Sequence, residues 1–145
     1  RITDFQCALG SSQLKKLDSF VKNRREIAKQ YYNLFSNIKF IKTPKVQNTV
    51  EHSYHLYPLQ INFEKLSLTK VEFFEKMKNA GILLQVHYIP IHIQPFYKKN
   101  YGFNKGDFPI SERFYRNEVS LPIYPDLLTD DVSMVINNIS EIIST

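Results

Sequence analysis

The fold is decided by the stretch from Tyr57 to Tyr88, which reads YPLQINFEKLSLTKVEFFEKMKNAGILLQVHY. Apolar side chains take every second position from Tyr57 to Phe63, and this alternation is the period of a strand with one buried face. Pro58 lies inside that strand. Because proline has no N–H to donate to a neighbouring strand, the pattern predicts an edge strand or a bulge.

The second half of this stretch predicts a short helix followed by another strand. Thr69 and Glu72 have the spacing of a capping box, and Gly81 suits the residue after a helix end. We therefore expect a helix from Lys70 to Asn79. The apolar residues that follow predict a strand from Ile82 to Tyr88.

Helices are also predicted on both sides of this stretch. Thr3 and Gln6 form a second capping box, so a first helix is expected from Asp4 to about Leu17, and Asp18 can cap the next one. Further helices are expected up to about Asn37, from Ile110 to Glu118, and from Thr129 onward. The segment 121–125 is too rich in proline for a central strand.

These elements make an α+β fold, with helices flanking a small, partly antiparallel sheet. Residues 1–145 are expected to form a single domain, because this length supports one hydrophobic core. The chain opens on Arg1 instead of a start methionine and is soon in an apparent helix. We therefore expect it to be a fragment of a longer protein.

Composition narrows the class of protein. The lone cysteine excludes an internal disulfide, and no apolar run approaches the roughly 20 residues of a membrane span. We expect part of a cytoplasmic enzyme that binds no membrane. The net charge of +5 would suit nucleic acid or a nucleotide diphosphate. Composition alone does not separate these two partners.

No motif in the chain supports catalysis by the chain alone. It has no cysteine pair for zinc, no glycine-rich phosphate loop and no serine–histidine–aspartate pattern. His52 and His55 would point to opposite faces of an extended segment, so no metal site is expected. His87 and Tyr88 are better candidates, since an imidazole and a phenol can bond to phosphate or sugar oxygens, although both can also be satisfied core groups.

Polar side chains crowd the otherwise apolar run from Gln85 to Tyr97, which reads QVHYIPIHIQPFY. Buried polar groups cost free energy unless they are hydrogen-bonded, so this many of them indicates a binding surface. His92 and Gln94 follow Pro90, whose fixed φ angle would stiffen the turn that presents them.

Four blocks of sequence, in order along the chain, resemble the DegT/StrS family of sugar aminotransferases. The blocks are RITDFQ at 1–6 with QLKKLD at 13–18, HLY at 55–57, residues 85–94, and SLPIYP at 120–125. The resemblance covers essentially the whole chain. It implies the small C-terminal domain of a fold-type I enzyme that depends on pyridoxal phosphate and moves an amino group from glutamate to a keto sugar on a nucleotide.

Within that family the first block and the run from His87 to Tyr97 look most like the pseudaminic acid branch. This likeness implies a UDP-linked 4-keto-6-deoxy sugar as substrate. The family's cofactor-binding lysine and aspartate belong to a large domain upstream, and no lysine here lies in a matching motif. The resemblance thus implies no catalytic or cofactor-binding residue in this chain, no bound pyridoxal phosphate, and no activity of the chain alone.

The resemblance also implies the substrate-binding residues. His87 and Tyr88 would reach the nucleotide sugar in the neighbouring subunit's site, with His92 and Gln94 close by. Arg1 would grip the nucleotide across the interface, as a guanidinium can bind diphosphate oxygens with two hydrogen bonds. The full-length protein would be a homodimer.

Two alternatives stay open. Some relatives carry histidine in place of the lysine and dehydrate the sugar, and this chain does not show which residue its protein has. The other alternative is a basic binding module. Its support is the interleaving of Tyr97, Tyr101 and Phe103 with lysines, although no nucleic-acid motif is present.

Overall fold

The computed structural model describes residues 1–144. Its centre is an antiparallel sheet in the order β1–β2–β3, with bounds Ile41–Lys42, Tyr57–Ile61 and Glu118–Leu121. In the register of the sheet, Ile41 of β1 lies opposite Ile61, and Val119 of β3 lies opposite Leu59. The α+β class and the antiparallel sheet predicted from the sequence are confirmed.

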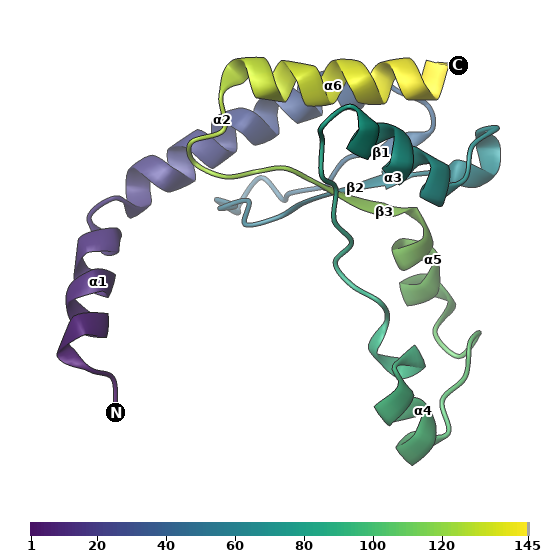
Figure 1. The fold of residues 1–145 in the computed structure, drawn as a ribbon, viewed down its shortest axis with the longest axis horizontal. Coiled ribbons are helices and arrows are strands. Elements are labelled where there is room, and N and C mark those ends of the chain that lie inside the picture. Colours follow the sequence, from purple (N-terminus) through teal and green to yellow (C-terminus); the bar gives the residue numbers. More distant parts are fainter. Residues whose placement is uncertain (145) are drawn as a thin grey trace.

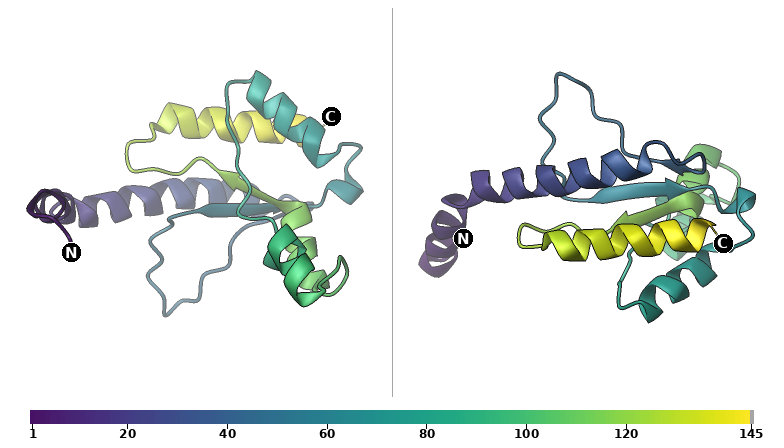
Figure 2. Two further views of the ribbon diagram at one scale, coloured as in Figure 1. Left: turned by 60° about the horizontal axis from the view of Figure 1, so that its bottom comes forward. Right: turned by 90° about the horizontal axis from the view of Figure 1, so that it is seen from above.

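Helices pack around this sheet and also project from it (Figure 1). Their bounds are α1 Asp4–Leu14, α2 Leu17–Phe35, α3 Lys70–Asn79, α4 Pro95–Tyr101, α5 Pro109–Asn117 and α6 Thr129–Ser144, with 3-10 turns η1 Phe63–Lys65 and η2 Ile91–Ile93. Helix α6 packs against α2 and α3, and Figure 2 shows α2 and α6 running alongside the strands. None of the helices in residues 1–144 is long and apolar enough to cross a bilayer.

Two limbs leave the sheet layer at its opposite ends. One is α1, and the other, here called the arm, runs from Tyr88 to Asn117 and contains α4 and α5. Both limbs extend toward the same side of the sheet layer in Figure 1. Helix α1 buries no side chain within residues 1–144. The core therefore lies in the sheet and in α2, α3 and α6.

The core follows the predicted periodicities. Every second residue of β2 is buried, and the inward stripe of α2 is Ile27, Ala28, Tyr31 and Phe35. Helix α6 adds Val132, Val135, Ile136 and Ile139. The Tyr31 hydroxyl donates to the Pro122 carbonyl at 2.8 Å, so this buried phenol has the partner that burial requires.

Helix α3 begins and ends where the sequence predicts. The Glu72 backbone N–H donates to the Thr69 side chain at 3.2 Å, and the Thr69 N–H donates to the Glu72 carboxylate at 2.7 Å. The Thr69 hydroxyl also donates to this carboxylate, and the bonds from the Thr69 N–H and hydroxyl lower the pKa of Glu72. At the other end Gly81 has a φ of +78°, and the Ile82 N–H donates to the Met77 carbonyl. This is the Schellman arrangement, which needs a residue tolerant of positive φ.

Loss of this cap should destabilise the domain. We expect Thr69→Ala to lower the free energy of unfolding by about 0.5–2 kcal/mol, since the backbone N–H of Glu72 loses its acceptor. Thr3→Ala is the matched control, because Thr3 and Gln6 make the same capping box on α1. Since α1 buries nothing in the chain, the control should leave global unfolding unchanged. Urea denaturation followed by circular dichroism measures both, and equal losses would contradict the assignment of α1 as a limb outside the core.

The first two helices differ from prediction at their junction. Helix α1 ends at Leu14, and α2 begins at Leu17 with Lys16 as its N-cap. Asp18 is therefore not a cap, and the prediction was wrong by two residues. Its carboxylate still lies in the first turn of α2, where a negative charge interacts favourably with the helix dipole.

Pro58 lies in the central strand, which corrects the prediction of an edge strand or bulge. Strand β1 is only two residues long and pairs with Ile61 and Gln60, so it does not reach Pro58. On the other side Pro58 lies opposite Ser120 of β3. Proline is tolerated because the strand has a neighbour on only one side at this position.

Two further strand assignments differ from the sequence prediction. Residues 82–88 form no regular strand and make a single antiparallel bridge, between Gln85 and Ser120. Glu118 was expected to end a helix, but it begins β3. Helix α5 ends at Asn117, and Glu118 has extended backbone because it pairs with Gln60 of β2.

Candidate functional site

The segment that carries the candidate site is attached to the outer edge of β3. The Ser120 N–H donates to the Gln85 carbonyl at 2.8 Å, and the Gln85 N–H donates to the Ser120 carbonyl at 3.3 Å. Two residues further along, His87 lies beside the side chains of this strand. The bridge therefore determines where His87 stands relative to β3.

His87 is held by two buried residues of β3. Its backbone N–H donates to Glu118 Oε2 at 3.0 Å, and its Nδ1 lies 2.7 Å from Ser120 Oγ. The Ser120 hydroxyl in turn donates to Glu118 Oε1. Glu118 is fully buried, and Ser120 is 4% exposed.

Glu118 and Ser120 were not predicted as partners of the site. Their spacing could have indicated the pair, since residues two apart on a strand face the same side. This spacing was overlooked because Glu118 was assigned to a helix.

Tyr88 faces solvent, with 72% of the residue exposed. Its ring meets the His87 ring edge-on, with the centroids 4.6 Å apart, and the peptide bond between the two residues is cis. Imidazole and phenol thus form one adjacent pair. A phenol in this position can donate to or accept from a ligand.

His92 faces inward. It is 7% exposed, its Nε2 lies 2.9 Å from Glu112 Oε1, and its ring packs on Phe108. The Gly106 N–H donates to the same carboxylate oxygen at 2.7 Å, and this bond and the one from His92 lower the pKa of Glu112. Within the chain His92 connects η2 to α5 through its bond with Glu112. A contact of His92 with a sugar stays a prediction.

Gln94 is the N-cap residue of α4, and it is half-buried. Its backbone carbonyl accepts from the Lys98 N–H, and its side chain makes no capping bond. Arg1 is exposed and lies at the free end of α1, at the opposite end of the molecule from the arm (Figures 1 and 2). The chain therefore brings His87 and Tyr88 together but does not bring Arg1 to α4.

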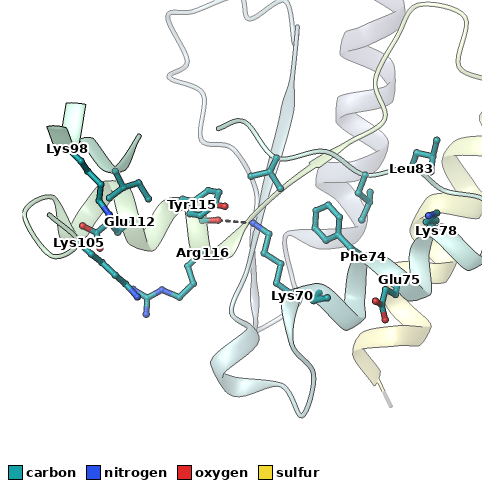
Figure 3. A pocket seen from close by; sticks show the side chains of 14 residues that line it. Lys70, Phe74, Glu75, Lys78, Leu83, Lys98, Lys105, Glu112, Tyr115 and Arg116 are labelled. Carbon is teal, nitrogen blue, oxygen red and sulfur yellow. Dashed lines mark hydrogen bonds between the residues drawn. The ribbon is translucent and has the colours of Figure 1, made fainter. Parts of the chain in front are cut away.

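A groove of about 910 Å³ lies between α3, the segment 83–86 and α5. Its walls combine apolar side chains with lysines, as Figure 3 shows. Lys70 crosses it and donates to the Tyr115 carbonyl at 2.8 Å. Burial lowers the pKa of Lys70, and the Glu118 carboxylate opposes this shift. None of the five candidate residues lines this groove.

The other histidines shape the loop before β2. The Tyr54 N–H donates to His52 Nδ1 at 2.9 Å. The Arg24 guanidinium donates to the carbonyls of Tyr54, His55 and Ile123 at 3.1, 3.2 and 2.8 Å. Residues 1–144 contain no group of three or more His, Cys, Asp or Glu side chains that could hold a metal ion.

The aromatic side chains of the arm pack on one another. Tyr101 stacks on both Tyr97 and Phe103, with centroids 5.8 and 6.1 Å apart, and Phe103 meets Phe108 at 5.5 Å. A base-stacking module needs ring faces that are free for bases. The interleaved rings that suggested such a module pack on one another, while Tyr101 is still 62% exposed.

Known proteins have a similar fold and a similar sequence. Residues 1–140 match the DegT/DnrJ/EryC1/StrS aminotransferase family. The chain is 40% identical to the spore coat polysaccharide biosynthesis protein SpsC of Bacillus subtilis, covering 97% of this chain and 36% of that protein. It is 38% identical to the UDP-4-amino-4,6-dideoxy-N-acetyl-beta-L-altrosamine transaminase of Campylobacter jejuni, covering 93% of this chain and 35% of that one.

Solved structures agree. PseC of Helicobacter pylori, an aminotransferase of pseudaminic acid biosynthesis, superposes with a TM-score of 0.86 at 28% identity, over 99% of this chain and 38% of that one. The PLP form of the sugar aminotransferase Spr1654 of Streptococcus pneumoniae gives 0.89 at 29% identity, over 99% and 36%. The chain thus spans little more than a third of the length of its relatives. From the match over residues 1–140 and these likenesses, the chain belongs to the DegT/DnrJ/EryC1/StrS aminotransferase family.

Proposed function

We propose that this chain is the substrate-facing small domain of an aminotransferase that moves an amino group from glutamate to a UDP-linked 4-keto-6-deoxy sugar. The observation that carries the proposal is the pair formed by exposed Tyr88 and half-buried His87, which is fixed to β3 through buried Glu118 and Ser120. The relative in Campylobacter jejuni is named for a UDP-linked amino sugar, and PseC for pseudaminic acid synthesis. We place the enzyme in the cytoplasm.

Pyridoxal phosphate would supply the carbonyl group that takes up and releases the amino group. The side chains of this chain do not fit it. Lys70 is partly buried, but its ammonium donates to the Tyr115 carbonyl and lies over the rings of Phe74 and Tyr115. We place the cofactor-binding lysine outside this chain and expect the chain alone to be inactive.

The two limbs support a dimer in the full-length protein. Helix α1 and the arm extend from opposite ends of the sheet layer toward one side, and α1 buries none of its side chains. One limb carries Arg1, and the other carries His92 and Gln94. These residues would contact the same ligand only if another protein surface lay between the two limbs. In the proposed homodimer, Arg1, His87 and Tyr88 serve the site of the partner subunit.

Substitution of the pair tests this function. In the full-length enzyme, His87→Ala and Tyr88→Ala should each raise the Michaelis constant for the nucleotide sugar roughly 3- to 10-fold, since a hydrogen bond contributes on the order of 0.5–1.5 kcal/mol. The visible absorbance of the bound cofactor should not change. Steady-state kinetics with the keto sugar and ¹⁵N-labelled glutamate measures both nitrogen transfer and substrate affinity.

Tyr32→Ala is the control, because it removes a tyrosine of similar exposure from α2. It should leave the Michaelis constant as it was. Loss of cofactor absorbance with an unchanged Michaelis constant would overturn the binding role of His87 and Tyr88. Loss of water from the sugar without transfer of nitrogen would instead identify a dehydratase.

A further inference from the structure

A buried chain of hydrogen bonds leads from Glu118 through Ser120 to the His87 ring. An ionised carboxylate can only accept hydrogen bonds. Its Oε2 accepts the backbone N–H of His87 at 3.0 Å, and its Oε1 accepts the hydroxyl of Ser120. The partly buried ammonium of Lys70 interacts electrostatically with the same carboxylate. Both oxygens of this fully buried group are thereby satisfied.

These bonds determine which nitrogen of His87 carries the proton. A serine hydroxyl has a single hydrogen, and here Glu118 accepts it. Ser120 Oγ can therefore only accept from His87 Nδ1, which lies 2.7 Å away. Nδ1 is then the protonated nitrogen, and in the neutral ring Nε2 is an acceptor. Among residues 1–144, Nε2 has no hydrogen-bond partner.

We propose that Glu118 and Ser120 are positioning residues that present His87 Nε2 to the ligand as a hydrogen-bond acceptor. An acceptor does not bind a phosphate oxygen, which is itself an acceptor. With its ring neutral, His87 therefore takes a donor group of the sugar, a hydroxyl or an amide N–H, and not the diphosphate. The tautomer follows from the geometry of this chain alone, whereas the identity of the ligand rests on the proposed function.

Glu118→Gln separates this role from simple packing, because it keeps the shape of the side chain. The backbone N–H of His87 can only donate, so it selects the oxygen of the introduced amide. The amide nitrogen must then donate to Ser120 Oγ, which frees the serine hydroxyl to donate to His87 Nδ1. We expect the tautomer of His87 to invert, with the proton on Nε2. A side chain with only a packing role would leave the tautomer unchanged.

The tautomer is read from two-bond ¹⁵N–¹H correlation spectra of the full-length protein labelled with ¹⁵N-histidine. Spectra are taken near pH 8.5, about two pH units above the ordinary histidine pKa of ~6.5, and His87 is assigned by its loss in His87→Gln. The unsubstituted protein should show a protonated Nδ1, and Ser120→Ala a mixture of tautomers. Glu26→Gln is the control, since it removes an exposed carboxylate from α2. A protonated Nε2 in the unsubstituted protein, or no inversion in Glu118→Gln, overturns the proposal.

Binding measurements test the second half of the proposal. By calorimetry, Glu118→Gln should weaken binding of UDP-4-amino-4,6-dideoxy-N-acetyl-β-L-altrosamine roughly 3- to 10-fold, as for one lost hydrogen bond, and leave binding of UDP unchanged. An equal loss of affinity for both ligands would show that His87 binds the diphosphate. An inverted tautomer without any loss of affinity would show that His87 does not contact the ligand. Either result overturns the acceptor role. If the unsubstituted protein binds neither compound, the proposed function fails, while the spectra still decide the tautomer.

Discussion

Phe73→Ala should lower the free energy of unfolding of the 145-residue chain by about 3–5 kcal/mol, the cost of removing a buried phenylalanine and leaving a cavity. Phe73 is fully buried on α3, and its ring meets Phe63 edge-on with the centroids 5.6 Å apart. It joins α3 to η1, which follows β2, so a cavity there affects the packing of both elements. Equilibrium denaturation in urea, monitored by circular dichroism, measures the loss.

Phe5→Ala is the matched control, because it removes the same side chain from a residue that is 90% exposed on α1. Exposed substitutions of this kind usually change stability by less than about 0.5 kcal/mol. A loss of several kcal/mol in the control, or none in Phe73→Ala, would show that the hydrophobic core is not where the structure has it.

Two inactive variants of the full-length enzyme should restore about a quarter of the activity when they are mixed. One variant lacks the cofactor-binding lysine, and the other is Arg1→Ala. Under random subunit exchange, half of the dimers contain one subunit of each kind. If Arg1 serves the partner's site, one of the two sites in each mixed dimer has both groups intact.

Rates are measured below the Michaelis constant, where loss of substrate binding has its full effect. A mixture of the lysine variant with Tyr32→Ala is a control for exchange and should recover activity in proportion to the intact lysines. If exchange is verified by mass spectrometry and the Arg1→Ala mixture stays as inactive as its components, Arg1 acts within its own subunit and the proposed interface role is wrong.

Local signals predicted both ends of α3, but they misplaced the junction of α1 and α2 and gave no helix at α4. The capping box of Thr69 and the positive φ of Gly81 depend on a few neighbouring residues, and both ends of α3 were correctly placed. Strands depend on partners that are distant in sequence. Strand β3 was missed because Glu118 continues the polar pattern of α5, and only pairing with β2 makes it extended. Pro58 was misjudged for the same reason, since the length of β1 cannot be read from the sequence around Pro58.

Polar residues in an apolar run indicated His87 and Tyr88 as candidate binding residues, and their contact with a ligand stays a prediction. The hydrogen bonds that hold His87 could not be predicted from the sequence. The role of Ser120 as a hydrogen-bond acceptor required the bridge between Gln85 and β3, which joins segments more than 30 residues apart. His92 has the same residue type as His87 and lies in the same run, yet its Nε2 is occupied by Glu112. Residue type and spacing do not distinguish these two environments.

The isolation of α1 has a consequence for measurements on the enzyme. An α-helix of 11 residues is marginal in water by itself, and α1 has no buried side chain in this chain to offset its conformational entropy. The ordering of Arg1 must then be coupled to association with another surface. In the proposed dimer, dilution below the dissociation constant of the subunits would weaken the apparent affinity for the nucleotide sugar. Titrations at protein concentrations below and above that dissociation constant would therefore give different affinities for one and the same ligand.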